Sequence, residues 1–180
     1  MMSSVPQAMP PQMTADRKAF GPGTRKLLAM AFGYLALKLL HIMLAITAVG
    51  ANLTYGAWFA RANSDPAFAP VALRGIRFLD NWIANPAYLL MLPTGAAMVA
   101  LGGLSFRTPW IALSVGLWVV AVLAGYLGYS PVLRAQIAAV DREGIAGPEA
   151  QRLAVRGYIW SGILGVLIVG IIVLMVFKPQ

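Results

Sequence analysis

Apolar residues gather in four long runs that carry no formal charge at neutral pH. A helix rises about 1.5 Å per residue, so about 20 residues cross a hydrocarbon core about 30 Å thick. The first run, 39–60, has 22 residues, and its apolar pattern extends back to about Leu27. We therefore predict an all-α membrane bundle whose four spans cover about residues 32–60, 82–102, 110–133 and 158–177.

Two connecting segments are amphipathic. In 66–81, apolar Leu73 and Ile76 lie opposite Arg74 and Arg77. Segment 132–143 is expected to extend the third helix into water. Both patterns resemble short helices that lie at a membrane interface. Prolines at positions 86, 93 and 131 each remove a backbone hydrogen bond, so bends are expected there.

Composition supports a membrane location. Hydrophobic residues make up 59% of the chain and charged residues 11%, against about 45–50% and about 25% in average soluble domains. The net charge of +8 comes from basic residues that flank the apolar runs, which is typical of membrane proteins and argues against nucleic-acid binding. The lack of cysteine excludes disulfides and thiolate sites, and a single histidine disfavours a metal site with several protein ligands.

Residues 1–26 are polar and rich in proline and glycine, so we expect a tail ahead of a four-span domain, 27–180. The tail has no apolar h-region, and a secretory signal is not expected. Four spans put both termini on one side of the membrane. Seven cations fall on the loop side, within 61–81 and 134–156, and six on the side of the termini, which is nearly a tie. A start at Met30 would remove four cations from the side of the termini, and on that basis we expect periplasmic termini.

One face of the first predicted helix collects its polar residues. Steps of three and four keep residues on one side of a helix, and the series is Tyr34, Lys38, His41, Ala45, Ala48, Asn52 and Tyr55. A charge that faces lipid at mid-depth costs at least about 2.5–3.5 kcal/mol. We therefore expect this face to point into the bundle, with His41 near Asn52 or Tyr88. Its candidate cofactor-binding residues are Lys38, His41, Asn52 and Tyr55.

The two ionisable residues of this face have alternative explanations. Lys38 can extend its ammonium group to the lipid headgroups, because the 22 uncharged residues after it suffice to span. His41 is either a neutral histidine hydrogen-bonded within the bundle, or an axial haem ligand or proton-handling group. The chain has no second histidine. A haem iron bound here would be five-coordinate or would need Met43, Met91, Met98, a tyrosine or the His41 of a second protomer.

The last run carries a stripe of small residues. Gly157, Ser161 and Gly165 follow one another at spacings of four, which places them on one helix face. Small residues let membrane helices approach closely, so we expect this stripe to pack against another helix.

Several short motifs resemble those of a widespread family of bacterial predicted integral membrane proteins of unknown function. The stretch "LKLLHIMLAITAVGANLTYGAWFARAN" (37–63) is similar to the opening helix of that family. Further similarities are Asp80-x-Trp82 leading to Pro93–Thr94–Gly95, then Thr108–Pro109–Trp110, and the ending "LMVFKP" (174–179). The resemblance covers about residues 33–179. It implies four helices in a bacterial cytoplasmic membrane and no established activity.

The Lys38-x-x-His41-Ile42 start is also similar to small bacterial membrane protoporphyrinogen oxidases and to copper-resistance D proteins. In the oxidases the histidine that matches His41 is held to bind haem, so the resemblance implies haem b as a candidate cofactor. The interval from His41 to Gly50 is one residue shorter in this chain, and a tryptophan of the oxidase pattern is missing. No catalytic residue is therefore carried over.

Three functions follow as hypotheses. The first is a non-catalytic integral membrane protein that binds haem or a porphyrin through His41. The second is an accessory subunit of a larger membrane complex, or a homodimer, since spans two to four hold few polar groups. The third, a small enzyme or transporter, is least favoured because the chain has one titratable stripe and no paired carboxylates. The expected partners are the lipid bilayer and other membrane subunits, with no nucleic acid.

Overall fold

The computed structural model describes residues 21–179, apart from the side chains of Pro22 and Asn63. Every regular element in this part of the chain is helical, which confirms the all-α prediction. The α-helices are α1 (Pro22–Ser64), α2 (Ala69–Leu79), α3 (Asn85–Leu101), α4 (Pro109–Leu123), α5 (Ser130–Glu143) and α6 (Pro148–Phe177). A 3-10 turn, η2 (Pro66–Phe68), and two π-helical segments, η3 (Asp80–Ala84) and η4 (Ala124–Tyr129), complete the fold.

The chain divides into two compact units, residues 1–36 and 37–180. In the first unit, α1 is already helical from Pro22, so the helix begins earlier than the tail boundary predicted at residue 26. Residues 1–20 of that predicted tail lie outside the described residues. The second unit contains the remainder of α1 and all later helices.

The second and third spans each continue into a long collinear extension. Segments α2, η3 and α3 form one helix, Pro66–Leu101, and α4, η4 and α5 form another, Pro109–Glu143. Each has about 35 residues and is about 50 Å long, well beyond a hydrocarbon core of about 30 Å. The prediction that both connecting segments are helical is confirmed, and 132–143 continues the third span as expected. Segment 66–81 does not lie apart from the spans but begins the helix of the second span. These segments extend the spans, and α2 packs against α5.

Proline explains where the two π-helical segments occur. A proline ring clashes with the carbonyl four residues earlier and cannot donate to it. Pro86 follows η3, and the residue four before it, Trp82, lies inside that segment. Pro131 follows η4 in the same way, with Leu127 inside it. The wider π turn relieves the clash, so the disturbance expected at these two prolines takes the form of a local widening.

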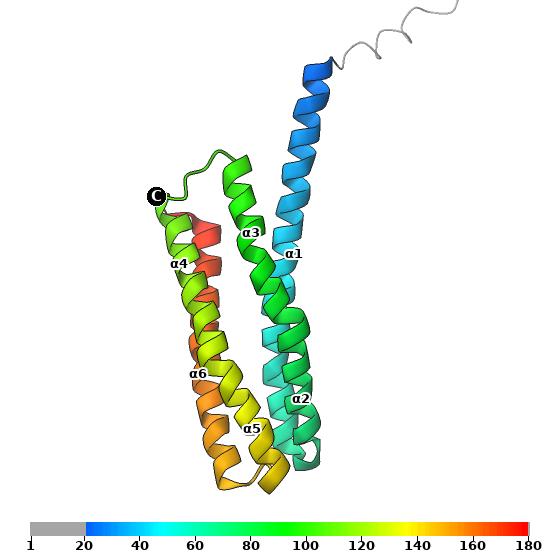
Figure 1. Cartoon of the computed structure of the whole chain (residues 1–180), viewed down its shortest axis with the longest axis vertical. Helices are drawn as coiled ribbons and strands as arrows, with labels where there is room; N and C mark the ends of the chain where they lie inside the picture. The colour runs from blue at the N-terminus through cyan, green and yellow to red at the C-terminus, as the bar shows by residue number, and fades with distance from the viewer. Residues whose placement is uncertain (1–20, 180) are drawn as a thin grey trace, which may run out of the picture. The chain divides into compact units, whose positions relative to one another are not determined.

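A compact core joins the extensions. The buried side chains of Leu73 and Ile76 on α2 belong to one cluster with Leu133 and Val140 on α5. In Figure 1 these helices lie at the same end as the C-terminal end of α1. Charged side chains cover this end, and the Arg74 guanidinium lies 2.8 Å from the Asp141 carboxylate. A charged surface over an apolar core is what water requires, so this end of the bundle extends beyond the hydrocarbon.

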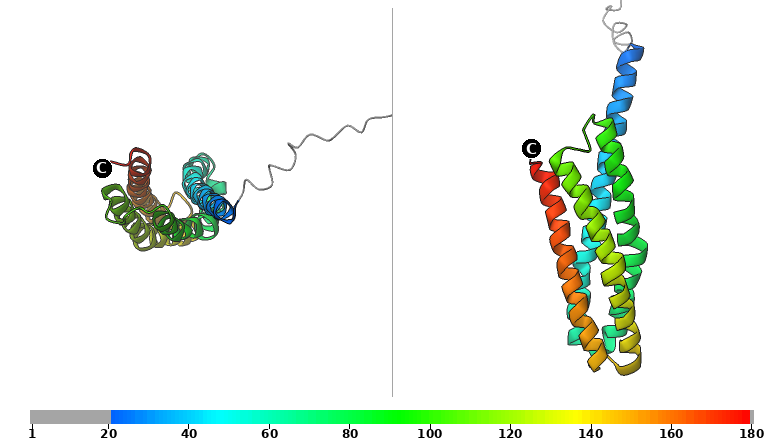
Figure 2. Two further views of the ribbon diagram at one scale, coloured as in Figure 1. Left: turned by 90° about the horizontal axis from the view of Figure 1, so that it is seen from above. Right: turned by 60° about the vertical axis from the view of Figure 1, so that its left-hand side comes forward.

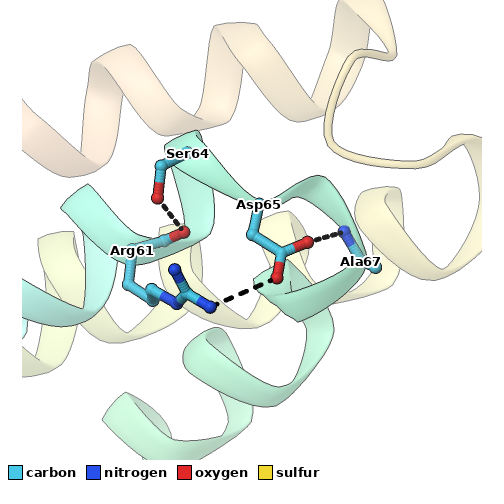
Figure 3. Close-up of polar contacts among 4 residues, drawn as sticks. All are labelled: Arg61, Ser64, Asp65 and Ala67. Carbon is cyan, nitrogen blue, oxygen red and sulfur yellow. Dashed lines mark hydrogen bonds and ion pairs between the residues drawn. The ribbon is translucent and has the colours of Figure 1, made fainter.

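A polar turn links α1 to this extension (Figure 3). The carboxylate of Asp65 accepts a hydrogen bond from the backbone N–H of Ala67 at 3.2 Å and thereby caps η2. The same carboxylate lies 3.5 Å from the guanidinium of Arg61, and the Ser64 hydroxyl donates to the Arg61 carbonyl at 3.0 Å. These contacts satisfy backbone groups that a helix end leaves unpaired.

The apolar parts of the four long helices, away from the charged end, suit a bilayer. Four helices are long and apolar enough to cross a membrane. Their large apolar side chains are widely exposed, as at Leu39, Leu90, Val120 and Val166. Lipid tails cover such surfaces in a membrane protein, whereas their exposure to water would be unfavourable. In the second unit, α6 packs along α4 and α5 (Figure 2).

Candidate functional site

The polar face of α1 turns toward the other helices of the second unit, as the sequence predicts. Ala48 and Tyr55 are buried, and His41, Ala45 and Asn52 are half-buried. Lys38 is exposed, which agrees with a position near the headgroups. Tyr34 belongs to the first unit.

His41 contacts α3. Its Nδ1 lies 2.8 Å from the Thr94 hydroxyl, and that hydroxyl lies 2.8 Å from the Leu90 carbonyl. Threonine has one hydroxyl hydrogen, and the Leu90 carbonyl and the His41 ring both lie within its reach. In the tautomer with its hydrogen on Nδ1, the ring donates to Thr94 and Nε2 is the basic nitrogen. The neighbouring Gly95 lets the ring approach, because a Cβ there would lie 3.2 Å from His41 Cε1.

The partner of His41 differs from the expectation. Asn52 and Tyr88 were the predicted neighbours, yet they pair with each other about three turns further along α1. The Asn52 amide donates to the Tyr88 hydroxyl and to the Ala48 carbonyl, both at 2.9 Å. The Trp118 indole N–H donates to the Tyr88 carbonyl at 3.2 Å, which ties α4 to the same point.

A second polar cluster, centred on Asp80, was not among the predicted site residues. Asp80 is only 8% exposed, and Asn85 donates to its carboxylate at 3.3 Å. The carboxyl is close enough to the phenols of Tyr55, Tyr88 and Tyr129 to interact with each electrostatically. The cluster lies where η3 meets α3, at the boundary between the charged extension and the apolar spans.

Two tyrosine hydroxyls in this cluster lack hydrogen-bond partners among the described residues. They belong to Tyr55 and Tyr129, which are both buried. Asp80 is a neighbour of the first hydroxyl and Ser161 of the second, but neither pair has hydrogen-bonding geometry. Buried polar groups without a partner are rare in native proteins, so each one calls for an explanation.

A cavity opens beside the Asp80 cluster. Its empty space, including the part open to the outside, is about 630 Å³. The polar side chains that line it are Asn52, Asp80, Asn85, Tyr88, Tyr129 and Ser130. Most of the remaining wall is apolar and comes from α4, η4 and α6. His41 does not line this cavity.

The sequence does contain a signal for Asp80. Leu73, Ile76 and Asp80 follow one another at steps of three and four, so Asp80 continues the buried face of α2. Tyr129 on η4 and Leu133 on α5 are likewise four residues apart and both buried, so Tyr129 continues the buried face of α5. These positions identify inward-facing polar residues once the apolar face of each extension is known.

The small-residue stripe of α6 meets other elements over part of its length. Gly157 is buried, and a Cβ there would lie 3.7 Å from the side-chain oxygen of Gln136. Ser161 is a neighbour of Tyr129. Gly165 is exposed, and a Cβ there would meet nothing within 4 Å, so the close contact predicted at this residue is not made within the described part of the chain.

The described residues contain no group of three or more His, Asp or Glu side chains able to hold a metal ion.

Comparison with known proteins gives one match. No curated protein matches the chain, and neither does any solved structure. The family described as "Predicted integral membrane protein (DUF2269)" matches residues 35–179, which is most of the chain. The resemblance predicted from the sequence motifs is thus confirmed, together with a multi-pass location in a membrane. The chain belongs to this family of predicted integral membrane proteins, whose function is unknown.

Proposed function

We propose that this chain is a non-catalytic membrane protein that binds haem or a related porphyrin through His41. The observation that carries the proposal is the 2.8 Å hydrogen bond between His41 Nδ1 and the Thr94 hydroxyl. Histidines that bind metals almost always donate their other ring N–H to a neighbour, which fixes the tautomer and orients the ring. Thr94 plays that part, and Nε2 is left with a free electron pair for an iron.

The donor set fits a haem with one histidine ligand. A bound haem would supply an iron centre for electron transfer or for binding a small gas. Met91 and Met98 lie on α3, the helix that carries Thr94, and are half-buried, whereas Met43 is exposed. A sixth ligand, where one is present, comes from one of these methionines, a tyrosine or the His41 of a second copy.

The test is the visible absorption spectrum of the purified protein with and without dithionite. We expect a Soret band that His41→Ala abolishes while expression is kept. Thr47→Ala, an exposed position on the same helix, is the matched control and should leave the band unchanged. If His41 is only a structural group, His41→Ala lowers stability by about 1–3 kcal/mol without a spectral change. A purified wild-type protein that is colourless and contains no porphyrin would contradict the proposal.

The second candidate function is an accessory subunit or a homodimer. The observation in its favour is an exposed face of small and β-branched residues on α6, which includes Gly162, Gly165, Val166 and Val169. Faces of this composition pack closely against other membrane helices. The contact predicted for Gly165 would then be made with a partner. A colourless protein that co-purifies with a stoichiometric partner, or as a dimer disrupted by Gly165→Leu, would favour this function.

The proposed location is a bacterial cytoplasmic membrane with both termini outside the cytoplasm. Seven arginines lie between residues 61 and 156 on the α2–α5 end of the bundle, and cations accumulate on cytoplasmic loops. Reporter fusions at the N-terminus and after the C-terminus should therefore give the same periplasmic signal. Opposite signals from the two fusions would show that the number of spans is odd.

A further inference from the structure

The Asp80 carboxyl is an isolated acid inside the bundle. Its one hydrogen bond from a described side chain comes from Asn85, at a long 3.3 Å. No Lys or Arg among the described residues forms an ion pair with it, although Asp65, Asp141 and Glu149 each have an arginine partner. A buried charge without a counter-charge is costly, and ionisable groups inside membrane proteins usually mark a binding or transport path.

The groups around Asp80 offer acceptors and aromatic faces. Tyr129 is 4% exposed, lines the cavity, and has no hydrogen-bond partner for its hydroxyl among the described residues. Tyr88 and Trp118 also line the cavity and are held in place by the contacts with Asn52 and with each other. A carboxylate next to several aromatic rings is the environment that recognises organic cations.

The rest of the cavity is apolar and elongated along the helices. Leu89 on α3 and Leu164, Ile168 and Ile171 on α6 line it. On α6 these residues follow at helical steps, so the wall runs from the level of Asp80 toward the interior of the spans. One end of the cavity is thus polar and carries a carboxyl group, and the other is suited to a hydrocarbon group.

Both π-helical segments border this cavity. Asp80 begins η3, and Gly125, Tyr126 and Tyr129 of η4 line the opposite wall. Single π-helical turns inside α-helices occur frequently at functional sites. Pro86 and Pro131 account for the two segments, and the segments bring residues of η3 and η4 to the same cavity.

We propose that the cavity binds a monovalent organic cation with an apolar tail, with its amine or ammonium group at Asp80. An anion would be repelled by the carboxylate. Hard metal ions require six or more oxygen ligands, which one carboxylate and a few amides do not provide. A lipophilic ammonium group neutralises Asp80, contacts the faces of Tyr88, Tyr129 and Trp118, and places its tail along α6. This site is distinct from the one proposed at His41 and does not depend on it.

The test is equilibrium binding of radiolabelled decyltrimethylammonium to the full chain in lipid nanodiscs, with empty nanodiscs as the baseline. We expect saturable binding to the wild type and none of decyl sulfonate, which has the same tail and the opposite charge. Asp80→Asn should weaken binding about 30-fold or more, because one partner of a buried charge pair is removed. Tyr129→Phe, which removes only the unpartnered hydroxyl, should weaken binding of a primary decylamine about 3- to 10-fold.

Asp141→Asn is the matched control, since it removes a carboxylate of the same bundle far from the cavity lining. Binding by this variant should equal that of the wild type. Asn keeps the size of Asp80, and monodisperse elution with an unchanged helical signal will show that the variant is folded. Absence of saturable cation binding, equal binding by Asp80→Asn, or equal binding of the sulfonate would each overturn the proposal. A missing Soret band would bear only on His41.

Discussion

Ile76→Ala is expected to lower the free energy of unfolding by about 2–5 kcal/mol, the usual cost of emptying a buried aliphatic position. Ile76 is 0% exposed and lies in the cluster that joins α2 to α5. This part of the bundle extends beyond the hydrocarbon, so its side chains gain the full benefit of leaving water. The same substitution on a lipid-facing position would gain or lose much less, because lipid tails are themselves apolar.

The measurement is reversible denaturant titration in detergent, followed by circular dichroism. Val71→Ala is the matched control, because Val71 lies on the same helix and is 56% exposed. Its effect should stay within about 0.5 kcal/mol. If Ile76→Ala and Val71→Ala had equal small effects, the packing of α2 on α5 would not contribute to stability, and the extension would be an independent pair of loose helices.

The sequence predicts the membrane helices and the inner face of α1. Long uncharged runs leave no alternative to spanning helices, since a bilayer cannot satisfy an irregular backbone. Ala48, Asn52 and Tyr55 lie on the expected inner face. Polar side chains that share one side of a membrane helix face the bundle, because exposing them to lipid costs free energy. The family assignment follows from the same stretch of chain.

The sequence predicts that the third span continues past Pro131, but not that the helix of the second span begins as early as Pro66. Prolines at 86 and 131 are expected to bend their helices, and each is accommodated by a π-helical segment that lets the helix continue. That outcome depends on neighbouring helices that hold the widened turn, which is information from tertiary packing. For the same reason the sequence marks Asp80 as an inward-facing residue, because it continues the face of Leu73 and Ile76, but does not show which groups surround it.

For small residues too, the sequence pattern predicts some contacts that the structure does not make and misses others that it does. The regular spacing of Gly157, Ser161 and Gly165 predicts a contact face, yet Gly165 meets nothing within the described chain. Among the described glycines of the membrane spans, the closest approach is made at Gly128, which was not part of the predicted stripe. Its place in η4 turns it toward the indole of Trp160 on α6.

Gly128→Ala is expected to destabilise the bundle by about 1–3 kcal/mol, the typical cost of inserting a methyl group into a closely packed site. A Cβ at this position would lie 2.6 Å from three atoms of the Trp160 ring. Real Cβ contacts are longer than this, so either the indole or the backbone of η4 must shift. The Trp160 ring is half-buried and packs against the core cluster that contains Tyr129 and Leu133, so a shift of the ring disturbs that packing and the cost exceeds that of an exposed glycine.

Gly116→Ala is the matched control, because Gly116 lies on the same continuous helix and a Cβ there would meet nothing within 4 Å. Alanine favours a helix over glycine, so this variant should be neutral or slightly more stable in the same titration. The smaller ring of Trp160→Phe should recover part of the loss when combined with Gly128→Ala, which a double-mutant cycle will measure. Equal effects of the two glycine substitutions, or no coupling with Trp160, would mean that α6 does not approach η4 at this point and that the cavity wall beside Tyr129 is built differently.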